Sequence, residues 1–323
     1  GDDSALSLIA DPGAPPRLGW HGQAIATLAR GPTLVQPAIQ IDPSLRRLEP
    51  LQVQAITERL HRFIAAQLAR HAGPLAAMGE AAGDLFTPPR IRALLAALTD
   101  NSGMIGRAAV EDQLNALAAD ERPQLRKLGF TIGSLDIFHP QLLKPEAVRW
   151  RAALIAAQQG SPIPALPPHG AVLQKAGSHA GLTIAGFRRC ATGWLRIDMA
   201  EKLARQAHAA RMQASAPPTA PIAGSDDHHD HIPIGEDTHI AAAPPGFVID
   251  PALATSLGLD EETRRGLLGS FGFRSVGEPA LQRWRWLGLR KPDKRARRKP
   301  PRKGGEAAPR AAATSDVRRL PVH

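Results

Sequence analysis

Hydrophobic residues recur every three or four positions in the first half of the chain, the spacing of one buried helix face. The longest such stretch begins at Pro50 and runs to about Met78. Its apolar positions are Val53, Ile56, Leu60, Ile64 and Leu68. Proline suits the first helical turn, where its missing N–H is not needed. The pattern therefore predicts one long amphipathic helix.

The same pattern predicts further helices up to residue 160. Thr87-Pro-Pro opens a helix. Its predicted buried face consists of Ile91, Leu94, Leu95 and Leu98. A third helix is expected over Arg107–Ala119, and a short one ends before Gly129, a left-handed cap. Pro145 begins the last helix, which Gly160 ends.

Residues 18–41 instead show a partial alternation of apolar and polar side chains, which is typical of strands. Gly22 is a turn signal inside Leu18–Leu28, and Ala38–Ile41 alternates again. We expect a small hairpin or open barrel here.

These patterns predict an α+β fold that is mainly α-helical. Its expected segments are a flexible start at 1–17, a small β element at 18–49, a helical domain at 50–160, a Pro- and Gly-rich linker at 161–181, a smaller unit of short strands and helices at 182–279, and a disordered basic tail at 280–323. The smaller unit includes a loop of low order at 213–246. Within it, Trp194–Ile197 is a predicted strand, and Asp198 and Glu201 have the spacing of a capping box that opens a helix.

The positive charge of the chain is local. Between Arg283 and Lys303 lie eleven Lys or Arg and one acid, Asp293, and this stretch accounts for the formal charge of +10. Such blocks mark tails that meet nucleic acid or another polyanion. Cys190 is the only cysteine, and no apolar run approaches the length of a bilayer span. We therefore expect a cytoplasmic protein with no membrane partner.

Catalytic motifs are not visible. An ATP-driven motor needs a glycine-rich loop ending in Gly-Lys-Ser/Thr, and the chain contains no Gly-Lys dipeptide. The acidic pairs Asp120-Glu121 and Asp260-Glu261 lie where helices are expected to begin, rather than after an apolar strand. We expect neither a Walker A nor a Walker B motif, no catalytic residue and no cofactor in this chain alone.

Metal-ligand side chains are densest between Asp226 and His231. The spacing of His228, His229 and His231 matches no zinc module, so a solvated loop is favoured over a metal site. Cys190 follows a predicted strand and is interpreted as a buried structural cysteine.

Two features indicate contact with nucleic acid. The prolines of the tail keep it extended, and its cations can displace counterions from phosphates. In Arg283-Trp-Arg-Trp286, an extended chain puts both indole rings on one side, where bases of a single strand can stack. The candidate binding residues are Arg283, Trp284, Arg285, Trp286, Arg290, Lys291, Lys294, Arg295, Arg297, Arg298, Lys299, Arg302 and Lys303. A solubilising tail, and a strand that packs its tryptophans inward, remain the alternatives.

Two short helices, expected to begin at Asp250-Pro251 and at Asp260, have the order of a helix-turn-helix. The first is short, and the second carries Arg264 and Arg265 but few side chains that read bases. An ordinary αα-hairpin is therefore favoured.

The run LRKLGFTIGSLDIFHPQLLKP at Leu125–Pro145 resembles a signature of alphaproteobacterial helicases related to the mitochondrial degradosome RNA helicase. Further pieces resemble that family in the same order: Gly19–Gly22, Ile25–Pro32, Ala185–Cys190, Leu195–Asp198, Ala254–Leu259 and Phe271–Arg274. The resemblance covers roughly residues 18–303 and does not include the motor motifs.

The resemblance implies an accessory C-terminal region of an ATP-dependent superfamily-two helicase. ATP and Mg²⁺ would then belong to motor domains of the same parent chain. The region itself would contact RNA or DNA, chiefly single-stranded, and RNA-processing proteins. Two alternatives stay open: a protein-docking scaffold whose tail binds acidic protein or ribosomal RNA, and a metal-dependent hydrolase that uses the histidine loop.

Overall fold

The computed structural model describes residues 5–190, 193–215, 246–276 and 282–288. Helices make up 51% of the described residues and strands 21%, which confirms the predicted α+β, mainly helical class. All of these described residues belong to one compact unit. In the described ranges, no helix is both long and apolar enough to cross a membrane.

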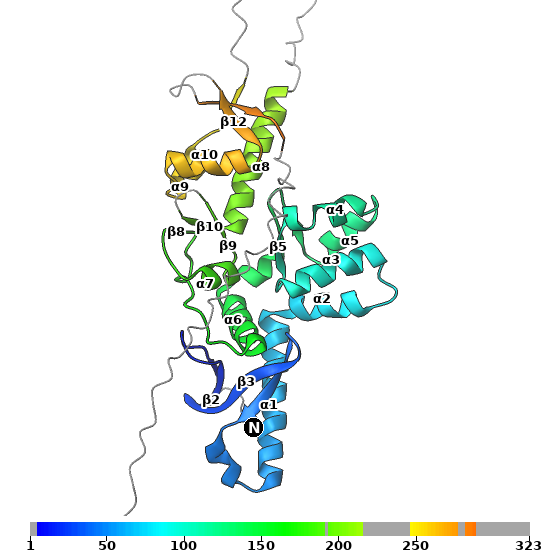
Figure 1. Ribbon diagram of the computed structural model, residues 1–323, viewed down its shortest axis with the longest axis vertical. Coiled ribbons are helices and arrows are strands. Elements are labelled where there is room, and N and C mark those ends of the chain that lie inside the picture. Colours follow the sequence, from blue (N-terminus) through cyan, green and yellow to red (C-terminus); the bar gives the residue numbers. More distant parts are fainter. Residues whose placement is uncertain (1–4, 191–192, 216–245, 277–281, 289–323) are drawn as a thin grey trace, which may run out of the picture. The chain divides into compact units, whose positions relative to one another are not determined.

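The N-terminal part is a four-stranded antiparallel sheet in the order β1-β2-β3-β4 (Figure 1). Its strands are β1 (Leu6–Ile9), β2 (Arg17–Trp20), β3 (Gln23–Thr33) and β4 (Gln36–Ile41). His21 and Gly22 have positive φ angles of 47° and 81°, which form a tight hairpin turn and confirm the predicted one. The expected flexible start is wrong from Leu6 onward, because Leu6 and Leu8 of β1 are buried in the core.

Helices follow the sheet. They are the 3₁₀ helix η2 (Pro43–Arg47), α1 (Pro50–His71), α2 (Gly73–Gly83) and α3 (Pro89–Asp100). α1 ends at His71 rather than near Met78, because Pro74 in the first turn of α2 offers no N–H and its ring clashes with the preceding turn. All four residues predicted for the buried face of α3 are buried.

The next segment mixes short helices with a three-stranded sheet of order β5-β7-β6. Its elements are β5 (Met104–Gly106), η3 (Arg107–Ala109), α4 (Glu111–Ala116), α5 (Glu121–Lys127), β6 (Thr131–Ile132), β7 (Asp136–Phe138), η4 (Pro140–Leu143) and α6 (Pro145–Gln159). The helix predicted over Arg107–Ala119 is split at Val110, whose φ of −125° is not helical. Gly129 takes the left-handed conformation predicted for it, with a φ of 85°. α6 ends at Gln159, directly before Gly160, which confirms the predicted end of this helix.

Residues 161–181, expected to form a linker, are part of the packed fold. Ile163 is buried; its N–H donates to the Ala14 carbonyl at 2.9 Å, and its carbonyl accepts from the Gly13 N–H at 2.8 Å. Further along, β8 (Leu173–Gln174) pairs with β10 (Trp194–Arg196). The expectation of a free linker is therefore wrong.

A second hydrophobic core lies in the C-terminal half. Its further elements are α7 (His179–Ile184), β9 (Phe187–Arg189), α8 (Ile197–Ser215), β11 (Phe247–Val248), α9 (Ala252–Ser256), α10 (Glu261–Ser270), β12 (Phe273–Val276) and β13 (Arg283–Trp286). The strands form two sheets, β8-β10-β9 and β11-β13-β12. β13 lies inside the segment expected to be a disordered tail, so that expectation is wrong for Arg283–Trp286.

Glu201 does not cap α8, contrary to the predicted capping box. The helix begins at Ile197, and the Asp198 carboxylate is paired with Arg196 at 2.7 Å. The Glu201 carboxylate instead accepts the backbone N–H groups of Ser134, Leu135 and Asp136 at 2.7, 2.6 and 3.0 Å. This buried side chain therefore ties α8 of the second core to the turn between β6 and β7.

Candidate nucleic-acid interface

The Arg-Trp-Arg-Trp segment forms β13, the central strand between β11 and β12. Its two tryptophans lie opposite phenylalanines: Trp284 is paired with Phe247 and Trp286 with Phe273. Alternation along the strand places both indole rings on the same face, as predicted. The two rings nevertheless have different surroundings.

Trp284 belongs to the core. Its side chain is only 1% exposed, and the guanidinium carbon of Arg264 lies 5.8 Å from the ring centroid. The indole Nε1 is buried and has no hydrogen-bond partner among the described residues. The prediction that Trp284 stacks on bases is therefore wrong, because its ring is already covered by the domain.

Trp286 is 40% exposed and lies at the rim of that core. The guanidinium of Arg211, from α8, lies 4.1 Å from its ring centroid, within the range of a cation–π contact. His208, one turn earlier on α8, has its ring centroid 6.2 Å away. Burial, together with the charge of Arg211, lowers the pKa of His208. Arginine and tryptophan are thus already arranged as a stacked pair.

A hollow of about 480 Å³ opens beside this pair. It is lined by Arg211, Met212, Ser215, Phe247, Arg285 and Trp286, among others. Arg285 is exposed, whereas Arg283 is half-buried and its Nη1 donates to the Gly246 carbonyl at 3.3 Å. We call the surface formed by Arg211, Arg285 and Trp286 the β13 edge. The name refers to the end of β13 at Trp286, since β13 itself is the central strand of its sheet.

The remaining predicted site residues lie outside the described part of the chain. These are Arg290, Lys291, Lys294, Arg295, Arg297, Arg298, Lys299, Arg302 and Lys303, together with the weak metal candidates His228, His229 and His231. Across the residues that are described, no group of three or more His, Cys, Asp or Glu is placed to hold a metal ion. The structure therefore brings together only the β13 part of the predicted site.

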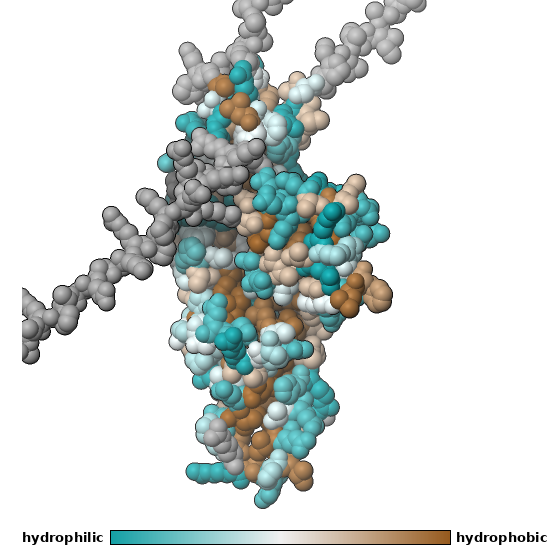
Figure 2. Space-filling model, turned by 45° about the vertical axis from the view of Figure 1, so that its right-hand side comes forward, coloured by the Kyte–Doolittle hydropathy of each residue, from teal (hydrophilic) through white to brown (hydrophobic). Residues whose placement is uncertain are grey.

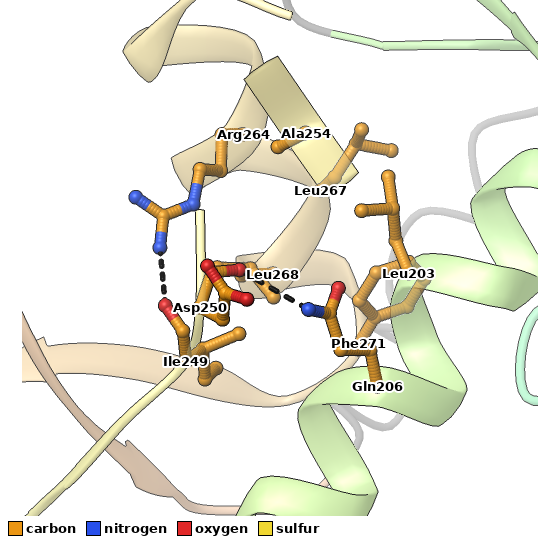
Figure 3. Close-up of a pocket in the computed structure, with 9 residues that line it drawn as sticks. All are labelled: Leu203, Gln206, Ile249, Asp250, Ala254, Arg264, Leu267, Leu268 and Phe271. Carbon is orange, nitrogen blue, oxygen red and sulfur yellow. Dashed lines mark hydrogen bonds between the residues drawn. The ribbon is translucent and has the colours of Figure 1, made fainter. Parts of the chain in front are cut away.

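The helices α9 and α10 pack against α8 around a hollow of only about 10 Å³ (Figure 3). Arg264 is buried, and its guanidinium donates to the Ile249 carbonyl at 2.9 Å and to Glu261 at 3.2 Å. Gln206 of α8 donates to the Asp250 carbonyl at 3.3 Å. Because these contacts occupy Arg264 inside the fold, they favour the αα-hairpin over a helix that reads bases.

The other candidate groups have structural positions. Asp260 accepts the N–H of Thr263 at 2.7 Å, and Glu121 accepts that of Ala118 at 2.6 Å, so both acidic pairs mark helix starts, as predicted. Cys190 is half-buried, and burial raises the pKa of its thiol.

Sequence reasoning did not identify Arg211 or His208. They are three residues apart on α8, a spacing that makes them neighbours on one helix face. That spacing is the one signal that could have grouped them, and nothing in it indicates that this face meets β13.

Comparison with models of protein families, with curated proteins and with solved structures found no match for this chain.

Proposed function

We propose that this chain is a nucleic-acid-binding accessory region of an ATP-dependent helicase, and that it contacts a single strand of RNA or DNA. The observation that carries the proposal is the β13 edge, where the exposed indole of Trp286 lies against the guanidinium of Arg211. Cations beside a stacking ring are the combination that binds single strands with little sequence preference.

The charge distribution supports the same proposal. β13 ends at Trp286, and the run of nine Lys or Arg from Arg290 to Lys303 follows directly in the sequence. The cations of this run can neutralise phosphates of a bound nucleic acid, and each neutralised phosphate releases counterions.

The helicase part of the proposal rests on the resemblance of Leu125–Pro145. In that arrangement, ATP and Mg²⁺ bind to motor domains of the same parent chain, and RNA-processing proteins are further partners. The single cysteine, which permits no intrachain disulfide, is consistent with a cytoplasmic place of action.

Binding of a fluorescent single-stranded RNA, followed by anisotropy over a salt series, tests the nucleic-acid part. Trp286→Ala should weaken binding about tenfold, because stacking contributes about 1–3 kcal/mol per base. Replacing the cations from Arg290 to Lys303 with alanine should weaken binding to all sequences about equally and flatten its salt dependence.

A chain ending at Gly288 is the suitable truncation, because it removes the basic run while retaining β13 and the buried Trp284. Glu262→Ala, at an exposed position of α10, is the matched control and should leave binding unchanged. If the salt dependence is unaltered without the basic run, or if Trp286→Ala binds like the parent chain, the proposed interface is wrong.

A second candidate, a protein-docking scaffold, is favoured by the loop between α2 and α3. Phe86 is 98% exposed beside exposed Leu85, and Figure 2 shows a brown protrusion on the side where Figure 1 places this loop. The Asp84 carboxylate accepts the Phe86 N–H and the Thr87 hydroxyl, both at 3.0 Å, so the loop is held in a defined conformation. Exposed apolar side chains held in this way are typical of contact sites between proteins.

If the chain is a protein-docking scaffold, its protein partners should remain bound after nuclease treatment. Leu85→Ser combined with Phe86→Ser should weaken such binding at least about tenfold, the effect of losing an interface hot spot. Leu51→Ser, at an exposed apolar position of α1, is the matched control. Partners that are released by nuclease, or that bind the double variant equally well, would exclude docking through this loop.

A further inference from the structure

Arg151 is a buried cation whose hydrogen bonds go to uncharged groups. It lies in the middle of α6, is only 1% exposed, and its Nη1 donates to the carbonyls of Leu142 and Ile184 at 3.1 and 2.9 Å. Its Nε is buried and has no hydrogen-bond partner among the described residues. One edge of the guanidinium is thus bonded to the fold, while Nε, on the other edge, has no partner.

No described carboxylate compensates this charge. The nearby Asp136 forms its ion pair with Arg188 instead. Burial lowers the pKa of Arg151 to about 9, so the side chain is still protonated at neutral pH. Buried charges in proteins are normally paired or coordinated, which makes an uncompensated buried guanidinium an unusual feature.

Arg151 lines a pocket of about 400 Å³. Other polar side chains of its wall are Asn101, Ser102, Gln159, Thr183 and Arg188. Asp136 and Arg188 form an ion pair on this wall, so Arg151 is the charged side chain of the described lining that has no ion-pair partner there. His179, at the start of α7, also lines the pocket.

We propose that this pocket binds a phosphate group, with the guanidinium of Arg151, whose Nε has no partner among the described residues, as its principal ligand. A planar guanidinium matches the spacing of two phosphate oxygens and forms two parallel hydrogen bonds with them. An anion at this place compensates the buried charge of Arg151, which no carboxylate of the described residues pairs. The volume of the pocket accommodates a phosphate together with a small organic group.

The proposal is independent of the β13 edge, because none of the residues that line this pocket belongs to that surface. Loss of single-strand binding in a Trp286 variant and loss of phosphate binding in a pocket variant therefore test different surfaces. Single-strand binding can be lost while phosphate binding is kept, and the reverse.

The test is titration of the full chain with inorganic phosphate, followed by calorimetry and by the thermal unfolding midpoint, with sodium chloride at equal ionic strength as reference. Phosphate should bind and raise the midpoint, whereas chloride should not. Arg151→Lys keeps the charge but loses the planar fork, and should weaken binding at least about tenfold, as expected for lost charge-assisted hydrogen bonds.

A second variant separates binding from folding. Ala180→Trp places a large ring at an exposed position of the pocket wall and leaves Arg151 intact, so it should weaken phosphate binding without changing the fold. Arg149→Met is the matched control: Arg149 is on the same helix, but it lines another hollow and donates to the Leu8 carbonyl. Phosphate that stabilises the chain no better than chloride, or that binds Ala180→Trp as well as the parent chain, would overturn the proposal.

The same titration identifies the source of the phosphate. A single-stranded oligonucleotide with a 5′-phosphate should displace bound phosphate, and its 5′-hydroxyl counterpart should not, if the pocket holds the end of a strand. If neither displaces it while ribose 5-phosphate does, the pocket serves a free small molecule. Either result supports the pocket as a phosphate site.

Discussion

Trp284→Ala should lower the free energy of unfolding by about 3–5 kcal/mol, as expected when a fully buried aromatic ring is removed from a core. The ring is 1% exposed and packs with Phe271 and Phe273 in the second hydrophobic core. Such a loss is a large part of the about 5–15 kcal/mol that stabilises a typical domain. Urea unfolding followed by circular dichroism measures it.

Trp286→Ala is the matched control on the same strand. Its side chain is 40% exposed, so its removal should cost about half as much as the removal of Trp284. Trp284→Phe should restore most of the stability, because the indole N–H that it removes has no partner in the described part of the chain. Equal losses for Trp284→Ala and Trp286→Ala would contradict the division of β13 into a core position and a binding position.

Glu201→Ala should destabilise the protein by about 3–5 kcal/mol, the range for breaking a buried charged network. The substitution leaves three backbone N–H groups, those of Ser134, Leu135 and Asp136, without their acceptor. Ser134 and Leu135 are half-buried and Asp136 is buried, so water replaces the lost hydrogen bonds only in part. Urea unfolding gives the free energy, and hydrogen exchange at the three amides should accelerate.

Gly133→Ala should also break the hydrogen bonds of the Glu201 carboxylate, without changing Glu201 itself. A Cβ added at Gly133 would lie 2.2 Å from Cδ of Glu201, so the carboxylate would have to leave its position. The two substitutions act on one network, and their combined effect should be smaller than the sum. Glu262→Ala, at an exposed position of α10, should change the free energy by less than about 0.5 kcal/mol. Additive losses for Gly133→Ala and Glu201→Ala would show that the carboxylate and the turn are not coupled.

Local signals predicted the elements that local physics determines. The turn at Gly22, the buried face of α3, the cap at Gly129 and the helix end before Gly160 each depend on a few neighbouring residues, and all are confirmed. The start of β1 was not predictable, because Leu6 and Leu8 become a strand only by pairing with β2 and covering the core. Glu201 shows the same limit: its spacing from Asp198 indicates a cap, but tertiary contacts with the turn at 134–136 override it.

The candidate site was predictable in composition and not in geometry. Alternation correctly places Trp284 and Trp286 on one face, but it does not tell which ring the domain covers. Arg211 contributes to the site from α8, more than seventy residues away in sequence. Arg151 gave no signal at all, because an arginine in a helix is ordinarily a surface residue and only the packed structure reveals its burial.

The hydrogen bonds between Gly13, Ala14 and Ile163 join segments separated by about 150 residues. On the ribosome, the N-terminal sheet can acquire these last contacts only after residue 163 has been synthesised, which takes about 8–30 s at about 5–20 residues per second. During that interval β1 and β2 must stay soluble without them. The Asp11–Arg17 ion pair on this sheet, at 3.2 Å, provides charged side chains of the kind that discourage pairing between unfinished chains. The segment at Gly13 and Ala14, which precedes β2, therefore forms its hydrogen bonds to Ile163 late in folding.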